Sequence, residues 1–258
     1  MKFINVGSGS KGNSTLIYSK NTTILVDCGV TKKRVVNCLK SISRSFESID
    51  AIFITHRHSD HAAHLSSYDC FASTTYSGDE GVIAQQYKKT NVLNPFQEIK
   101  IGDFIIRALP TSHDAPDSMG YLFKEINNDE TLLYMTDTGF IPERDLNYMK
   151  NCDFYLIESN HDPRMLMNST RSNYLKMRII GDHGHLSNEQ CSHYLSMIIG
   201  DKTKEIDFAH LSEECNTPKL AINVFHDVMR IQCGEVPSNI TIKTFNQKEP
   251  TSGGDSAL

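Results

Sequence analysis

Residues 52–61 read Ile-Phe-Ile-Thr-His-Arg-His-Ser-Asp-His, an apolar run that becomes polar in mid-stretch. Residues 50–55 have the composition of a buried strand, and the part that follows carries His56, His58, Asp60 and His61. Neutral imidazole and carboxylate groups suit zinc, and also manganese or iron. The stretch therefore predicts a metal site at the end of a strand.

The spacing of these four residues bears on the number of ions. In a turn that leads into a helix, His56 and His58 can point one way while Asp60 and His61 point another. That arrangement suits two ions about 3.5–4 Å apart, as in two-metal hydrolases. A solvated histidine-rich loop is the alternative, but solvation gives no reason for four ligand-type residues to follow a strand directly.

A site with two ions needs further ligands, and three candidates stand where a predicted strand has just ended. His113 comes after a strand that reaches residue 109, Asp137 after residues 133–136, and His210 after residues 208–209. A lone histidine at a strand end is more often a surface residue than a ligand. Three such residues occur in a chain that already contains the first motif, which indicates that they are metal ligands.

Composition limits the class of protein. The chain has 258 residues, enough for a sizeable core, and its formal charge of −5 argues mildly against a large basic nucleic-acid surface. No window approaches the ~20 apolar residues of a membrane span, and residues 1–5 lack the apolar core of a signal peptide. The seven cysteines are scattered and odd in number, which predicts reduced thiols in a cytoplasmic protein.

Helix and strand patterns interleave in both halves of the chain, which is typical of sheets packed face to face with helices outside. No linker or repeat interrupts residues 1–246, so we expect one domain there. Residues 247–258 are polar and rich in Gly and Ser, which predicts a disordered tail. The other predicted elements discussed below are a helix from Ala62, a short strand near residues 71–75, and helices over residues 79–89, 187–199 and 217–232.

The order of the ligand-type residues resembles a known family. His56-x-His58-x-Asp60-His61, followed by His113, Asp137 and His210, is similar to the metal motif of the metallo-β-lactamase superfamily. The resemblance implies an α/β fold, a four-layered αββα sandwich with the metals at one edge of its sheets. It also implies two divalent ions with the following ligands: His56, His58 and His113 for one ion, Asp60, His61 and His210 for the second, and Asp137 as the bridge.

Four further blocks resemble the YycJ (WalJ) branch of that superfamily. They are the glycine-serine loop at residues 7–14 and the blocks at residues 158–162, 181–188 and 210–218. Members of the branch are regarded as 5′→3′ DNA exonucleases linked to DNA repair. The resemblance implies a dinuclear metal-dependent phosphodiesterase with DNA as its substrate and without a membrane or an organic cofactor. One departure is His64. Relatives usually carry glycine one position later or a longer aliphatic turn, so the side chains that line the metal site differ in this chain.

Hydrolysis at such a site needs a nucleophile and a proton donor. Coordination lowers the pKa of water to about 7, which predicts a metal-bound hydroxide as the nucleophile. Asp60 can bind metal, and it can also accept the proton of the water. His185 is the predicted donor to the leaving oxygen, because phosphodiesterase relatives place a histidine in a similar block before the last ligand. In the alternative interpretation, His183 and His185 only cap the helix at Ser187 or hold a loop.

The donor should have a partner that orients it. In some relatives an acidic residue three positions before the bridging aspartate has this role, but this chain has Tyr134 there. Glu158 is then the nearest candidate.

Two segments are candidates for substrate contact. The loop at residues 7–14 offers backbone N–H groups to a phosphate, although a plain turn between strands explains such a loop as well. Residues 161–178 combine Arg164, Arg171, Lys176 and Arg178 with Tyr174 and several methionines, which suits a strand-binding wall. An amphipathic pair of helices, with its methionines and Leu175 in the core, explains that segment equally well. The predicted substrate contacts are Ser8, Ser10, Lys11, Asn13, His183 and Asn216.

Three other functions fit part of the sequence. The same metals can serve a hydrolase of a small phosphodiester, a thioester or a lactone, since one fold supports many reactions. A redox di-iron protein usually has a glutamate where His58 stands and a flavin-binding partner domain, for which this chain has no room. A non-catalytic protein on a degraded fold should have lost ligands, whereas this set is complete.

Overall fold

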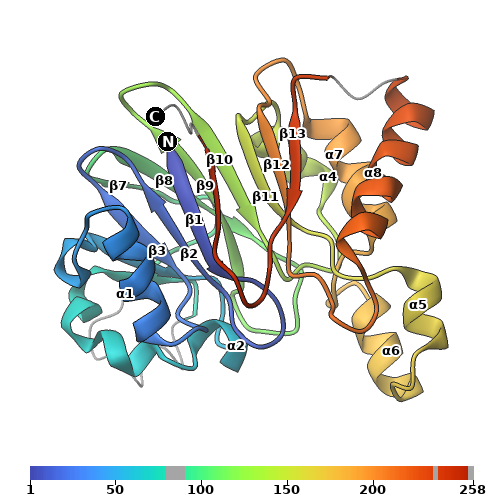
Figure 1. Cartoon of the computed structure of the whole chain (residues 1–258), viewed down its shortest axis with the longest axis horizontal. Coiled ribbons are helices and arrows are strands. Elements are labelled where there is room, and N and C mark those ends of the chain that lie inside the picture. Colours follow the sequence, from blue (N-terminus) through green and yellow to red (C-terminus); the bar gives the residue numbers. More distant parts are fainter. Residues whose placement is uncertain (80–90, 235–237, 255–258) are drawn as a thin grey trace. The chain divides into compact units, whose positions relative to one another are not determined.

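A computed structural model describes residues 1–79, 91–234 and 238–254 (Figure 1). Its contacts divide the chain into two compact units. Unit 1 contains Met1–Pro110, Ala115–Thr131 and Asn246–Leu258, and unit 2 contains Thr111–Asp114 and Leu132–Phe245. Within the described ranges, every helix is too short or too polar to cross a membrane.

Unit 1 is built on a seven-stranded sheet with the order β14-β1-β2-β3-β4-β5-β6. Strands β3 to β6 run parallel, whereas β14, β1, β2 and β3 pair antiparallel. A separate antiparallel run, β7-β8-β9, belongs to the same unit. The strands are β1 (Lys2–Gly7), β2 (Ser14–Tyr18), β3 (Thr23–Val26), β4 (Ala51–Ile54), β5 (Thr75–Ser77), β6 (Asn91–Val92), β7 (Glu98–Ile101), β8 (Phe104–Pro110), β9 (Met119–Glu125) and β14 (Thr251–Gly254).

Helical segments of unit 1 follow β3 and β4. Helix α1 (Lys32–Ser41) packs Val35 and Leu39 into an apolar cluster with residues of the sheet. After β4 come the short α2 (Ser59–Ala62) and a 3-10 segment, Leu65–Thr74, which replace the helix predicted from Ala62 and most of the strand predicted near residues 71–75. A further 3-10 turn spans Phe46–Ser48. The helix predicted over residues 79–89 falls almost wholly outside the described residues.

An aromatic cluster fixes β4, the strand that leads into the metal motif. Phe53 is fully buried; its ring stacks on Tyr76 at 5.1 Å and meets Tyr121 of β9 edge-on, also at 5.1 Å. The hydroxyl of Tyr121 donates to the carbonyl of Ile54 at 2.7 Å, and the amide of Met119 donates to the carbonyl of Thr55 at 2.9 Å. The end of β4 is therefore held from the side by β9.

Phe53→Ala should reduce the free energy of unfolding by about 3–5 kcal/mol, because it removes a large side chain from a closed cluster. Urea denaturation of the two proteins measures the difference. Phe140→Ala is a suitable control, since Phe140 is partly exposed. A loss for Phe53→Ala no greater than that of the control would contradict this packing.

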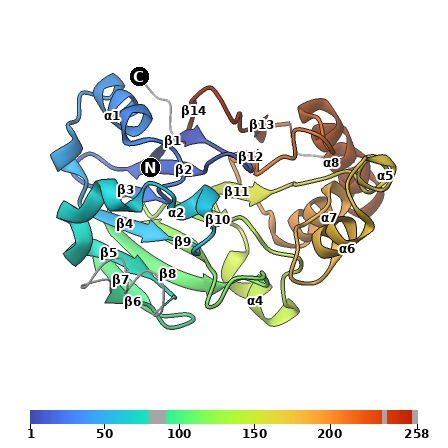
Figure 2. The same cartoon turned by 90° about the horizontal axis from the view of Figure 1, so that it is seen from below.

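Unit 2 contains four parallel strands, with helices in the connections between them. Strands β10 (Thr131–Met135), β11 (Phe154–Glu158), β12 (Glu205–Ala209) and β13 (Thr241–Thr244) pair in that order. Their carboxyl ends therefore meet at one edge. The helices are α4 (Glu143–Met149), α5 (Pro163–Asn168), α6 (Asn173–Ile180), α7 (Asn188–Ile198) and α8 (Pro218–Cys233), with α7 packed on α8 (Figures 1 and 2).

The two long helices of unit 2 begin with side-chain caps. Ser187 and Gln190 form a capping box at the start of α7, and the hydroxyl of Thr217 accepts from the backbone N–H of Leu220 at the start of α8. Both helices agree with the sequence prediction to within one residue at each end.

The prediction of a disordered tail over residues 247–258 is wrong for residues 251–254. Residues 246–258 belong to unit 1, and Thr251–Gly254 form β14, which pairs with β1. The guanidinium of Arg34 also donates to the carbonyls of Gln247 and Lys248, at 3.2 and 3.0 Å. A polar, glycine-containing segment can join a sheet edge because backbone hydrogen bonds hold it there, and composition does not report them.

Candidate metal centre

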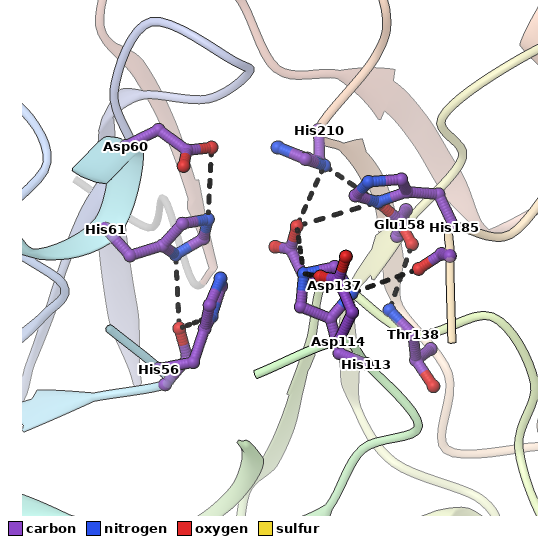
Figure 3. Close-up of polar contacts among 12 residues, drawn as sticks. His56, Asp60, His61, His113, Asp114, Asp137, Thr138, Glu158, His185 and His210 are labelled. Atoms are coloured by element: carbon purple, nitrogen blue, oxygen red, sulfur yellow. Dashed lines mark hydrogen bonds and ion pairs between the residues drawn. The ribbon is translucent and has the colours of Figure 1, made fainter. Parts of the chain in front are cut away.

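The first motif lies where β4 ends in unit 1. His56 and His61 are buried, and the ring of His56 lies 4.7 Å from that of His58 and 4.1 Å from that of His61. Asp60 places Oδ2 3.5 Å from Nε2 of His61 (Figure 3). The structure therefore brings the four residues of the motif together within unit 1.

A buried aspartate and a threonine determine which nitrogen the motif histidines present. Asp27 follows β3, and its Oδ2 accepts from Nδ1 of His61 at 2.8 Å. The hydroxyl of Thr55 donates to Asp27 at 3.0 Å, so it can only accept from Nδ1 of His56 and His61, at 3.0 and 3.1 Å. Both rings then carry their proton on Nδ1 and a lone pair on Nε2, the form that binds a metal through Nε2.

The glycine-serine loop supports the motif from its other side. The amide of Asn13 lies 2.9 Å from Nε2 of His61 and donates to Oδ2 of Asp60 at 3.4 Å. Its backbone N–H donates to the carbonyl of Asp60 at 2.7 Å. Gly29 permits this approach, because a Cβ there would lie 1.7 Å from the same carbonyl oxygen. The loop thus fixes two predicted ligands.

Asp27→Asn should weaken metal binding by about 10- to 100-fold, which is the usual cost of losing an outer partner of a metal ligand. Asparagine tolerates the positive φ of 62° at this position, so the backbone should be preserved. Competition with a chromophoric chelator measures the affinity. The control is Asp50→Asn, which removes an exposed carboxylate at the opposite end of β4. Equal affinities of Asp27→Asn and the wild type would contradict the role of Asp27.

In unit 2 the predicted ligands lie at the carboxyl ends of parallel strands. Asp137 comes two residues after β10, and His210 directly after β12. Both have left-handed backbone angles, with φ of 56° and 55°. Non-glycine residues rarely adopt this conformation, and it gathers at functional sites. The sharp turns direct both side chains to the edge of the sheet.

These turns create a compact group of ligand-type atoms. Asp137, Glu158, His185 and His210 each offer one atom within 4.8 Å of the others. Oδ1 of Asp137 lies 3.4 Å from Nδ1 of His210 and 3.6 Å from Nδ1 of His185 (Figure 3). A group of this composition suits a divalent cation.

Glu158, the last residue of β11, joins the predicted donor to a predicted ligand. Its Oε1 accepts from Nδ1 of His185 and from Nδ1 of His210, both at 2.8 Å. Its Oε2 accepts from the backbone N–H groups of Thr138 and Leu186, at 3.2 and 3.1 Å. Burial alone would raise the pKa of Glu158, but the two histidines outweigh it and lower that pKa to about 2. Glu158 is thus an ionised partner for both rings.

His113 is held by the loop that carries His185. Its Nδ1 donates to the carbonyl of Gly184 at 3.1 Å, which leaves the lone pair on Nε2, 3.9 Å from Oδ1 of Asp137. Burial lowers the pKa of His113 and so favours the neutral, metal-binding form. Gly184 must be glycine, because a Cβ there would lie 2.1 Å from the carbonyl oxygen of Ile179.

The remaining predicted contact residues differ in exposure. Ser10, Lys11 and His183 are exposed, and Nδ1 of His183 lies 3.2 Å from the hydroxyl of Ser112. Ser8 and Asn216 are buried. The amide of Asn216 donates to the carbonyl of Ser159 at 2.9 Å and to Oδ1 of Asn188 at 2.8 Å, so it ties together β11, α7 and α8.

Sequence reasoning missed two residues that organise the motif of unit 1. These residues are Asp27 and Thr55. Asp27 does carry the signal used for the other ligands, because it directly follows a strand. The block at residues 158–162 also contributes a structural contact, because the amide of Asn160 donates to the carbonyl of His210 at 2.8 Å.

Comparisons with known proteins agree with the family resemblance of the metal motif. A family model described as the beta-lactamase superfamily domain matches residues 22–203. The chain is 34% identical over 232 residues to exodeoxyribonuclease WalJ of Streptococcus pneumoniae, covering 85% of each. It is 30% identical over 259 residues to exodeoxyribonuclease YycJ of Bacillus anthracis, covering 97% of each.

A solved structure supports the fold. The metallo-β-lactamase fold protein YhfI of Bacillus subtilis matches with a TM-score of 0.68 at 16% identity, covering 98% of this chain and 99% of that one. The predicted fold class and the prediction of a metal-dependent hydrolase are confirmed by these matches. The chain belongs to the metallo-β-lactamase superfamily, in the branch of the WalJ and YycJ proteins.

Proposed function

We propose that the protein is a dinuclear metal-dependent phosphodiesterase, a 5′→3′ DNA exonuclease. The observation that carries the proposal is the arrangement around Glu158, where one carboxylate binds both a predicted metal ligand and a predicted proton donor. The exodeoxyribonuclease names of relatives that match most of the chain support DNA as the substrate.

The proposed metal ligands are those of the family motif. Four of their histidines, His56, His61, His113 and His210, use Nδ1 for a hydrogen bond inside their own unit. This pattern fits a metal centre, because it fixes the tautomer that keeps a lone pair on Nε2. The full proposed set is His56, His58, Asp60 and His61 in unit 1, with His113, Asp137 and His210 in unit 2. Two divalent ions of zinc, manganese or iron would supply Lewis-acid chemistry and lower the pKa of water.

The side chains of the protein have two tasks in the proposed reaction. Asp60 accepts the proton of the attacking water as its oxygen bonds to phosphorus. The bond from phosphorus to the leaving sugar oxygen then breaks, and His185 gives that oxygen a proton. Oε1 of Glu158 accepts a hydrogen bond from Nδ1 of His185 at 2.8 Å and holds the ring in place during the transfer.

The setting of the reaction is also part of the proposal. All seven cysteines are free thiols, which suits a reducing compartment such as the cytoplasm. A DNA exonuclease there would act in DNA repair.

The substrate can be tested with linear single-stranded DNA, linear duplex DNA and a closed circle, each with manganese. Separate 5′ and 3′ labels report the direction of degradation. We expect linear DNA to lose its 5′ label first and the circle to persist. Cleavage of the circle would contradict an exonuclease. Cleavage of bis(p-nitrophenyl) phosphate without any loss of DNA would instead favour a small phosphodiester as the substrate.

A further inference from the structure

Residues 246–248 lie directly against the start of the glycine-serine loop, within unit 1. The backbone N–H of Ser8 donates to the carbonyl of Asn246 at 3.3 Å. One residue further along the loop the approach is close, because a Cβ on Gly9 would lie 2.9 Å from the side-chain nitrogen of Gln247. The segment then continues into β14, which pairs with β1 (Figure 2). A strand therefore anchors the segment that contacts the loop.

Arg34 of α1 joins this segment to the strand that leads into the loop. Its Nη2 donates to the carbonyl of Val6 near the end of β1. The same nitrogen donates to the carbonyls of Gln247 and Lys248, at 3.2 and 3.0 Å. Hydrogen bonds from a charged donor are stronger than those between neutral groups. One guanidinium thus holds the end of β1 and residues 247 and 248 together.

Asn246 shapes the segment for this contact. Its Oδ1 accepts from the backbone N–H groups of Lys248 and Glu249, at 2.7 and 3.2 Å. An asparagine that bonds the backbone two residues further on forms a turn. This turn fixes the backbone whose carbonyls accept from Arg34. We call Arg34 and residues 246–248 together the clamp.

The glycine-serine loop connects the clamp with the metal motif. Oδ1 of Asn13 accepts from the backbone N–H of Gly9 at 2.7 Å, and the amide of Asn13 donates to the carbonyl of Gly9 at 3.1 Å. The backbone N–H of Asn13 donates to the carbonyl of Asp60 at 2.7 Å. A continuous series of contacts within unit 1 therefore runs from the clamp through the loop to Asp60.

We propose that the clamp positions Asp60 for metal binding, with Arg34 as a positioning residue of the centre. The clamp fixes the start of the loop, the start of the loop fixes Asn13, and Asn13 fixes the backbone of Asp60. A carboxylate that is held in its binding position before the ion arrives binds the ion more tightly, because it loses less conformational freedom. This inference rests on the proposed role of Asp60 as a metal ligand, and it is independent of DNA as the substrate.

The test is the affinity of Arg34→Met for zinc, measured on metal-free protein by competition with a chromophoric chelator. Methionine keeps an apolar stem on α1 but removes the donors that hold residues 247 and 248. We expect the Kd for zinc to rise about tenfold, in the range for losing an outer partner of a metal ligand.

Arg44→Met is the matched control, because Arg44 makes the same kind of contact elsewhere in unit 1. It donates to the carbonyls of Ser19, Lys20 and Thr22, in the turn between β2 and β3. That turn lies at the opposite end of β2 from the glycine-serine loop. Arg44→Met should therefore lower Tm while leaving the Kd for zinc unchanged.

A second variant tests whether Arg34 acts through the C-terminal segment. Asn246 is exposed, so Asn246→Ala should preserve the fold while loosening the turn. We expect it to raise the Kd for zinc about threefold. In the double variant the Kd should stay near that of Arg34→Met alone, because residues that act through one contact are not additive.

Hydrogen exchange gives a measurement that needs no metal. In metal-free protein, the backbone amides of residues 7–14 should exchange faster in Arg34→Met than in the wild type, because the loop opens more often. Arg44→Met should leave their exchange rates unchanged.

Several outcomes would overturn the inference. An unchanged Kd for zinc in Arg34→Met would do so, as would an equal rise in Arg34→Met and Arg44→Met. Effects that multiply in the double variant would show that Arg34 acts independently of residues 246–248. If wild-type protein degrades DNA, these results count against the inference alone. If wild-type protein binds no zinc, manganese or iron, the proposed function is wrong as well.

Discussion

Glu158→Gln should lower kcat on DNA by about 100- to 10,000-fold, the range for loss of general acid catalysis. The substitution preserves the size of the side chain but removes its charge and half of its acceptors. Oε2 of Glu158 accepts from two backbone N–H groups, which would hold the amide oxygen of glutamine on that side. The amide NH₂ would then face Nδ1 of His185 and His210.

Two donors cannot share a hydrogen bond, so both rings would have to turn or move their proton to Nε2. His210 would lose the lone pair with which it is proposed to bind metal. His185 would lose the hydrogen-bond acceptor that orients its ring. We therefore also expect metal affinity to fall by about 10- to 100-fold.

Steady-state rates on single-stranded DNA at saturating manganese, with metal content measured alongside, test this prediction. Glu205→Gln is the matched control, because Glu205 is a buried carboxylate at the amino end of β12 that pairs with Lys243. A Glu158→Gln enzyme with normal kcat and normal metal content would show that Glu158 only braces the fold.

His185→Ala should lower the rate on DNA by a similar factor, about 100- to 10,000-fold, because the sugar alkoxide is a poor leaving group without a proton. The rate on bis(p-nitrophenyl) phosphate should fall far less, since nitrophenolate leaves readily as an anion. The two substrates together separate proton donation from every other role of His185.

The separation matters because His185 also lies among ligand-type atoms, with Nδ1 3.6 Å from Oδ1 of Asp137. If His185 were a metal ligand, His185→Ala would lose metal and would slow both substrates equally. Metal content measured by mass spectrometry after dialysis distinguishes the cases. His193→Ala is the control, because His193 lies on α7 and contacts Gln232 of α8.

The sequence was most informative where function requires several unusual residues close together. His56, His58, Asp60 and His61 lie within six positions, so their pattern stands out from ordinary loops. The structure gathers them within unit 1, as that pattern predicts. The position of the candidate ligands of unit 2 at strand ends was also predictable from the sequence. Parallel strands bring their carboxyl ends to one edge, so these ligands lie close together.

Asp27 and the tail show what could not be read in advance. Asp27 bonds His61 because β3 pairs with β4 in parallel, a long-range relation that local patterns do not encode. Residues 251–254 join β1 through backbone hydrogen bonds, which leave no trace in side-chain composition. The sequence could not show which methionines of α6 face the solvent. Methionine occurs both in cores and on exposed surfaces, so only the burial of each side chain in the structure distinguishes the two.

One measurement tests the central claim most directly: release of labelled nucleotides from linear single-stranded DNA by manganese-loaded wild type and Asp60→Ala, assayed side by side. We predict steady release from an end by the wild type, abolished by EDTA and absent in Asp60→Ala. DNA left intact by metal-loaded wild type, or degraded equally by both proteins, would contradict the claim that this centre hydrolyses DNA.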